Sequence, residues 1–221
     1  MSVRAAVPAD AHTITEIAIA ALPSDEQWPY RFRYAQQYPK DHWSFSYRRF
    51  LSWIQAAPHF TVLVVEIPQS DTTRVIGYSV WQMPGTFVGD SIVHLPRDQY
   101  GRRDGDPARM KAFRDALSAA RQRLFDGPYG NDQLNLVQIA VDPSYQRRGA
   151  GMLMTNWGLD KSHELSVTVT LFASAQGRRL YRKLGFNEVD VVHVQADGED
   201  VFVDIPAMTY RAGVGTCPAP K

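Results

Sequence analysis

The chain of 221 residues has one cysteine, Cys217, and a formal net charge of only +1. A single cysteine allows neither a disulfide within the chain nor a metal site built from several thiolates. A balanced charge with no long run of one sign argues against general nucleic-acid binding, because that activity needs a basic face. We therefore expect no nucleic-acid partner, and we expect most Lys and Arg side chains to lie on a solvated surface.

Three further features are missing. The residues from Met1 to Arg4 lack the apolar core of a signal peptide, and no segment has the apolar length of a membrane span. The six histidines form no His-x-x-x-His pair and do not gather with acidic residues, so no metal cofactor is expected. With 44% apolar residues the chain is globular rather than disordered, and we expect a cytoplasmic protein without a membrane partner.

Hydrophobic spacing predicts the elements of the first part of the chain. Asp10 has the character of a helix N-cap, and Pro23 stops the helix that follows. The expected elements are a strand at 3–7, a helix at 10–22, an irregular aromatic segment at 24–40, a helix at 43–57, and a hairpin of strands at 60–67 and 74–83.

An insertion at 84–130 follows this hairpin and carries its own helix, which starts at Asp106-Pro107 and ends at Asp126-Gly127-Pro128. The remaining expected elements are a strand at 134–141, a helix at 152–164, a strand at 167–172, a helix at 174–184, and a hairpin of strands at 189–194 and 201–205. This order predicts an α/β fold with a mixed sheet, part parallel and part antiparallel. We expect a single domain at 1–211 and a flexible C-terminal tail at 212–221.

The join between strand 134–141 and helix 152–164 carries the first motif, Gln-Arg-Arg-Gly-Ala-Gly at positions 146–151. In a strand–turn–helix of this kind, backbone N–H groups converge and the helix N-terminus adds partial positive charge, so an anion binds there. Glycine lets the main chain approach the ligand, and Arg147 and Arg148 add full charges. The spacing matches neither a Walker loop nor the dinucleotide-binding fingerprint.

The stretch from Ala173 to Phe186, ASAQGRRLYRKLGF, is the second motif. The two motifs are similar to the Q-x-x-G-x-G and A-S-x-x-G-x-x-L-Y-x-K-L-G-F patterns of the GCN5-related N-acetyltransferases (GNAT). They stand in that family's order and separation, and the expected element order resembles that of the family over nearly the whole chain. The insertion at 84–130 is an addition between its third and fourth strands.

This resemblance implies an acetyl-CoA-dependent transfer in which the amine of a small molecule attacks the thioester directly. It implies that Tyr181 is catalytic and protonates the departing thiolate. It also implies that a backbone N–H near Ile139 stabilises the developing oxyanion, without a covalent acyl-enzyme. The residues implied in binding the coenzyme are Ile139, Ala140, Val141, Gln146, Arg147, Arg148, Gly149, Ala150, Gly151, Met152, Ser174, Gly177 and Tyr181.

The general base stays open at the level of sequence. Some relatives place a carboxylate or a histidine on the strand before the loop, where this chain has Asn135 and Val137. That departure argues against a histone-type lysine acetyltransferase, for which a glutamate is expected in the place of Asn135. The general base is then either a chain of water molecules or a residue in or next to the insertion, such as His94, Asp90 or Asp132.

The acceptor is expected to bind between the segments 24–57 and 84–130, which are rich in aromatic residues. These aromatic residues have two possible roles: they form the wall of a pocket for an apolar or aromatic amine, or they belong to the ordinary core. They are Trp28, Tyr30, Phe32, Tyr34, Trp43, Phe87 and Tyr100. Three alternative functions remain, namely transfer to a protein or peptide, transfer to a hydroxyl, and acyl-CoA sensing without catalysis. Monomer and homodimer are both compatible with the sequence.

Overall fold

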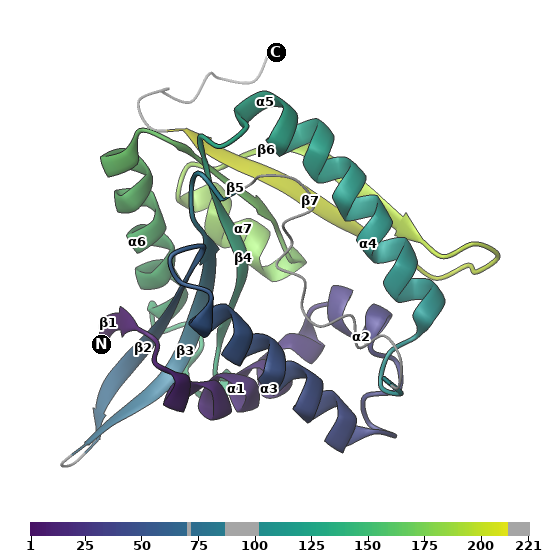
Figure 1. Ribbon diagram of the computed structural model, residues 1–221, viewed down its shortest axis with the longest axis horizontal. Coiled ribbons are helices and arrows are strands. Elements are labelled where there is room, and N and C mark those ends of the chain that lie inside the picture. Colours follow the sequence, from purple (N-terminus) through teal and green to yellow (C-terminus); the bar gives the residue numbers. More distant parts are fainter. Residues whose placement is uncertain (70–71, 87–101, 212–221) are drawn as a thin grey trace.

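The computed structural model describes residues 1–69, 72–86 and 102–211. Phe87, Asp90, His94, Tyr100 and Cys217 therefore lie outside the described residues. The helices and strands, shown in Figure 1, are β1 Ser2–Ala5, α1 Ala11–Ala21, α2 Gln27–Arg31, α3 Pro39–Gln55, β2 Phe60–Gln69, β3 Thr72–Gln82, α4 Pro107–Arg121, α5 Gly127–Tyr129, β4 Gln133–Val141, α6 Ala150–Leu165, β5 Thr168–Phe172, α7 Ala175–Lys183, β6 Asn187–Gln195 and β7 Phe202–Arg211.

The strands form one seven-stranded sheet in the order β1-β2-β3-β4-β5-β7-β6. β4 and β5 run parallel, and the other neighbouring pairs run antiparallel. The helix α6 is the crossover that connects the parallel pair, as parallel strands require. The predicted α/β fold with a mixed sheet is therefore confirmed.

Helices cover both faces of the sheet. On one face α1 and α3 bury Ile14 and Phe50 against Tyr78 of β3. On the other face α6 buries Met154 against β2 and β3, and α7 contributes to a second cluster around β4 and β5. α4 packs along β6 on the same face of the sheet as α1 and α3. The side chains of β5 show this, since Phe172 packs with α4 while the preceding residue, Leu171, packs with α7 on the opposite face. Figure 1 shows α4 lying along the yellow β6–β7 hairpin.

Two irregularities in β4 shape the centre of the sheet. The register between β3 and β4 shifts after Val80↔Gln138, so that Trp81 pairs with Leu136 and Val137 is the extra residue of a β-bulge. The pairing between β4 and β5 ends at Leu136↔Leu171, although β4 continues to Val141. The two strands therefore part at the bulge, and the last residues of β4 have no partner on the β5 side.

The structure corrects three predicted boundaries. The segment 24–40 contains the single-turn helix α2, which is too short to show a hydrophobic period. The helix of the insertion passes from α4 through a π turn at Gln122–Asp126 into α5, so it continues to Tyr129 beyond the predicted stop. β7 extends to Arg211 instead of ending at 205, because Pro206 stays in register opposite Val191 of β6.

Close packing of α6 on the sheet generates a stability prediction. A Cβ added at Gly158 would overlap the ring of Trp81, which is fully buried. We expect Gly158→Ala to lower the free energy of unfolding by about 1–3 kcal/mol through overpacking, although alanine favours a helix by itself. Urea unfolding followed by circular dichroism measures the change.

Gly151→Ala in the same helix is the matched control, because its Cβ would make only an ordinary contact of 3.6 Å with Leu180. We expect this variant to be neutral or to gain up to about 1 kcal/mol. A Gly158→Ala protein as stable as the Gly151→Ala protein would contradict the packing of α6 on Trp81.

Candidate active site

The loop between β4 and α6 is held in an unusual backbone conformation. Gln146 donates from Nε2 to the carbonyl of Val141 at 3.1 Å, which fixes the start of the loop on the end of β4. Arg147 and Gly149 both have positive φ angles, 63° and 94°. Such left-handed residues within a turn direct successive N–H groups to one side, and this arrangement binds anions.

The loop leads directly into the N-terminus of α6. Gly149 is the N-cap, and no side chain in the described part of the chain accepts from the first helical N–H groups, those of Ala150, Gly151 and Met152. Arg147 and Arg148 are exposed beside them, and the Arg148 guanidinium lies 5.2 Å from the centre of the Tyr145 ring. Free amides, the helix dipole and two cations therefore coincide, as an anion site requires.

The open edge of β4 adjoins this loop. Backbone groups two residues apart in a strand face the same edge. The Val141 carbonyl faces the edge away from β3, since it accepts from Gln146, and the N–H and C=O of Ile139 face the same way. Ala140 faces β3, where it pairs with Tyr78, and its side chain is buried. Of the three predicted strand residues, Ile139 and Val141 thus present main-chain groups to a ligand.

Tyr181 lies on α7 beside the gap between β4 and β5. Its side chain is 4% exposed and packs against Phe186, with the ring centres 5.4 Å apart. Burial, and secondly the charge of Asp25, raise the pKa of Tyr181 well above its ordinary value. The phenol is therefore protonated at neutral pH, which is the form in which it can donate a proton.

Ser174 and Gly177 position this tyrosine. Ser174 is the N-cap of α7, and its Oγ accepts from the Gly177 N–H at 2.9 Å, as the sequence predicts. A Cβ on Gly177 would lie 2.9 Å from Cε2 of Tyr181. The glycine thus leaves room for the tyrosine ring over the first turn of the helix, which is a reason that the sequence alone did not reveal.

Asp25, whose charge acts on Tyr181, was not singled out by sequence reasoning. It lies between α1 and α2, and Gln27 fastens this segment to the turn before α7 by donating from Nε2 to the carbonyl of Ala173 at 3.0 Å. Burial raises the pKa of Asp25, and its charge acts on Tyr181. The pattern around position 25 gave no signal, because the contact with α7 arises only from the fold.

Two residues considered at the level of sequence for the general base, Asn135 and Asp132, do not lie at the gap between β4 and β5. Asn135 is buried and donates from Nδ2 to the carbonyl and hydroxyl oxygens of Thr170, while its Oδ1 accepts from Arg121. It is fully engaged in a network beneath α4. Asp132 precedes β4 at the end opposite the loop, roughly 20 Å along the strand from Ile139. Neither residue is placed to receive a proton at the gap.

The described aromatic residues of the expected acceptor wall are mostly core residues. Trp28, Tyr30 and Phe32 are each at most 5% exposed. Trp43 of α3 stacks on Tyr47 with ring centres 5.0 Å apart, and its ring lies 5.3 Å from that of His12 on α1. The aromatic segment therefore builds the scaffold of α2 and α3 more than it lines an open wall.

A separate hollow of about 570 Å³ lies between α1 and the β2–β3 hairpin. Its principal charges are mutually paired, because Arg4 binds both Asp10 and Glu66 at 2.7 Å. In the part of the chain that the structure describes, no group of three or more His, Cys, Asp or Glu residues could hold a metal ion. No helix in the same ranges is long and apolar enough to cross a membrane.

Comparison with known proteins gives matches to acetyltransferases. Residues 119–188 match the model of the acetyltransferase (GNAT) domain. An acetyltransferase of Stachybotrys chartarum is 27% identical over 96% of this chain and 90% of its own length. An alanine N-acetyltransferase of ribosomal protein bS18 from Salmonella typhimurium is 38% identical, over 27% of this chain and 43% of its own length.

Solved acetyltransferase structures share the fold of this chain. A histone acetyltransferase HPA2-related protein of Corynebacterium glutamicum superposes with a TM-score of 0.59 at 17% identity, over 98% of both chains. The paiA N-acetyltransferase of Thermoplasma acidophilum, solved with coenzyme A, gives a TM-score of 0.56 at 13% identity, over 95% of this chain and 98% of its own. The chain thus has the fold of the GNAT acetyltransferases and a GNAT domain match at residues 119–188, and these likenesses support an acyltransferase, as the two motifs predict.

The contact between Gly177 and Tyr181 generates the second prediction. Gly177→Ala is expected to lower the free energy of unfolding by about 1–2 kcal/mol, because the new methyl group displaces the tyrosine ring. In a Tyr181→Ala background the same change is expected to cost much less, so the double-mutant cycle should show a coupling of about 1 kcal/mol. Independent effects, measured by urea unfolding of the four proteins, would contradict the placement of the ring.

Proposed function

We propose that this protein is an N-acetyltransferase that moves the acetyl group of acetyl-CoA to the amine of a small molecule. One juxtaposition carries the proposal, namely the open edge of β4 between the uncapped amides of α6 and the buried Tyr181. This edge offers main-chain hydrogen bonds along a strand, an anion site at one end and a proton donor at the other.

The fit of a coenzyme A molecule rests on the same groups. The amides of Ala150, Gly151 and Met152, with Arg147 and Arg148, would hold the pyrophosphate. The main-chain groups of Ile139 and Val141 would pair with the pantetheine arm as an added strand does. Acetyl-CoA supplies the activated acyl group as a thioester, and a published neighbour, the yncA protein of Salmonella typhimurium, was solved with acetyl-CoA as its cofactor.

Three residues of this chain then serve the transfer. Asp25 accepts a proton from the acceptor amine, so that the nitrogen attacks with its lone pair free. The Ile139 N–H donates a hydrogen bond to the acyl oxygen as negative charge develops on it. Tyr181 donates its proton to the sulfur as the C–S bond breaks and the C–N bond forms. Burial raises both pKa values, which makes Asp25 a stronger base. Tyr181 stays protonated but becomes a weaker acid, so its proton transfer depends on its position beside the sulfur.

The insertion favours a small acceptor over a protein segment. α4 contacts α2 and is tied to the C-terminal hairpin, where Arg109 forms an ion pair with Glu199 at 2.6 Å. The Phe113 ring lies 4.1 Å from the Arg31 guanidinium of α2. This bridge across the acceptor side restricts the approach of an extended chain, so peptide transfer, as in the bS18 acetyltransferases, is the alternative outcome of the assays below.

Substitutions in the coenzyme site and at the proton donor should affect different kinetic constants, KM and kcat respectively. We expect Arg148→Glu to raise the KM for acetyl-CoA about tenfold or more, because it places an anion beside the pyrophosphate. We expect Tyr181→Phe to lower kcat about 100-fold with little change in that KM. Thiol release from acetyl-CoA is measured with small amines, amino acids and short peptides as acceptors.

Arg179→Glu on the exposed side of α7 is the control for the charge reversal. Full turnover by Tyr181→Phe would remove the tyrosine from the mechanism. Coenzyme A binding with no turnover on any acceptor would instead favour a sensor, and failure to bind coenzyme A would contradict the proposed function.

The role of Asp25 predicts a dependence on pH. We expect Asp25→Asn to lower kcat/KM about 100-fold at neutral pH, because the amide cannot accept the proton. The ratio of wild-type to variant rates should shrink as the pH falls, since protonation inactivates the wild-type carboxylate over a range raised above that of an ordinary aspartate. Taking the ratio cancels the titration of the acceptor amine.

Glu26→Gln, which changes the exposed neighbouring carboxylate, is the matched control and should keep the wild-type profile. A constant ratio across pH would show that Asp25 serves only to hold the segment before α2, where it also accepts from the Gln27 N–H at 3.3 Å.

A further inference from the structure

Three arginines from separate parts of the chain converge beside the proposed acceptor side. Arg31 and Arg102 share the Phe32 ring, with guanidinium carbons 5.1 and 4.5 Å from its centre. Arg102 also lies 4.8 Å from the ring of Phe45, which is one helical turn before Arg49 on the same side of α3. We call Arg31, Arg49 and Arg102 the arginine cluster.

The acidic partners of the cluster balance only part of its charge. Asp104 accepts from Arg102 at 2.7 and 2.8 Å, and it also contacts Nδ1 of His42 at 2.6 Å. His42 accepts at Nε2 from the Trp28 indole at 3.2 Å, so its ring is the neutral Nδ1–H tautomer and adds no charge. Asp25 acts electrostatically on Arg31. Among the described residues, two carboxylates thus face three guanidinium groups.

Arg49 carries the unbalanced charge. Its Nε is buried without a hydrogen-bond partner, and its guanidinium carbon lies 5.1 Å from the centre of the Trp53 ring. Burial, and secondly the charge of Arg102, lower the pKa of Arg49 to about 10. Burial and the charge of Arg49 lower the pKa of Arg31 to about 9. A partly buried cation without a counter-ion among the described residues is costly, and an anionic ligand would relieve that cost.

Two more unpartnered polar atoms lie on the same face of the sheet. The hydroxyl of Tyr78, whose side chain is fully buried, and Oε1 of Gln138 have no hydrogen-bond partner. Tyr78 contacts Phe50, the neighbour of Arg49, at 5.0 Å between ring centres, and its electrostatic partner is Arg49. Gln138 is opposite Val80 and directly precedes Ile139, whose N–H faces the open edge of β4.

We propose that Arg49, supported by Arg31 and Tyr78, binds a carboxylate of the acceptor, so that the amine substrate is an amino acid. This proposal rests on the proposed acetyltransferase function and names its substrate class. Arg49 and the Tyr78 hydroxyl supply donors to a carboxylate, and Gln138 Oε1 supplies an acceptor for an N–H of the same molecule. The proposed N–H acceptor Gln138 is then one residue along β4 from the amide that receives the acyl oxygen.

Kinetics on paired acceptors test this assignment. Glycine, β-alanine, 4-aminobutyrate and L-phenylalanine are compared with their carboxamides, which keep the size and the amine but lose the charge. A carboxamide lowers the amine pKa, so chemistry alone favours the uncharged partner. We expect kcat/KM to be about tenfold or more higher for at least one acid than for its amide. The spacing of the best acid reports how far the carboxylate lies from the reacting nitrogen.

The variants assign the preference to the cluster. Arg49→Gln is expected to abolish the preference for the acid, and Arg114→Gln, which removes an equal charge from the exposed side of α4, is expected to keep it. Tyr78→Phe removes only the unpartnered hydroxyl and should weaken the preference for the acid several-fold. This variant tests the proposal if Arg49→Gln does not fold. Equal rates for acids and amides in the wild type, or a preference unchanged in Arg49→Gln and Tyr78→Phe, would overturn the proposal while the acetyltransferase function stands.

A binding measurement separates this proposal from the activity on which it rests. Calorimetry of the coenzyme A-saturated protein with the same four acids is expected to show binding of at least one acid by the wild type, with about tenfold or more lower affinity in Arg49→Gln. Such binding without any turnover would support the anion site and contradict the proposed chemistry. Failure of all four acids to bind or to react would overturn the amino-acid assignment.

Discussion

The parting of β4 from β5 after Leu136 is the feature on which the site depends. A parallel pair normally satisfies its backbone groups along the whole ladder, and leaving several of them unpaired is costly unless a ligand or water meets them. The bulge at Val137 accompanies the parting and keeps the register with β3 on the opposite edge. The open edge, the loop at its end and the tyrosine beside it all follow from this single departure from regular pairing.

Much of this arrangement was accessible from the sequence, for identifiable reasons. The loop at 146–151 and the turn before α7 are local structures, so glycine, capping and charge patterns predict them directly. The helix start at Asp106 and the Ser174 cap were predicted in the same way and are present. The bulge was not predictable, because it depends on how two distant strands align rather than on the residues around Val137.

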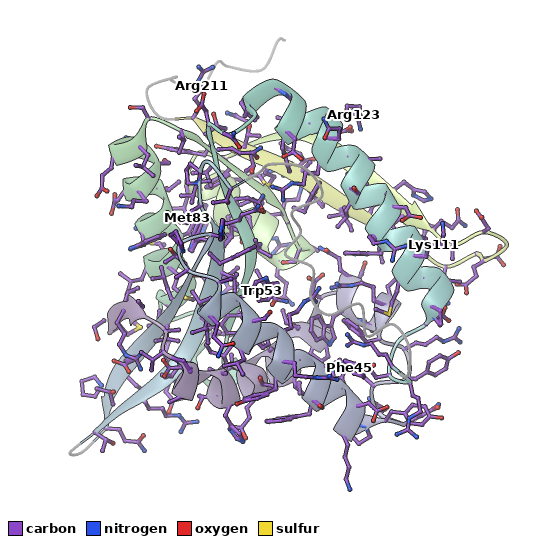
Figure 2. All side chains as sticks on the ribbon, in the orientation of Figure 1. Phe45, Trp53, Met83, Lys111, Arg123 and Arg211 are labelled. Carbon is purple, nitrogen blue, oxygen red and sulfur yellow. The ribbon has the colours of Figure 1, made fainter. Side chains whose placement is uncertain are left out.

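The charged groups of the acceptor side were also not predictable from the sequence, because they come together only in the folded chain. Asp25 and Arg49 lie in segments without a recognisable motif, and only the fold brings both to where their charges act on Arg31 of α2. Phe45 and Trp53 are labelled along α3 in Figure 2. Burial then raises the pKa of a carboxylate and lowers that of a guanidinium, effects that no sequence pattern encodes.

The most direct test of this account is amide hydrogen exchange with and without coenzyme A. If the open edge of β4 and the start of α6 bind the coenzyme, the amides of Ile139, Gly151 and Met152 should exchange much more slowly when it is bound. The amide of Ala140 faces β3 and should change little. Unchanged exchange at Ile139 and in the first turn of α6, under conditions where coenzyme A is bound, would contradict the central claim.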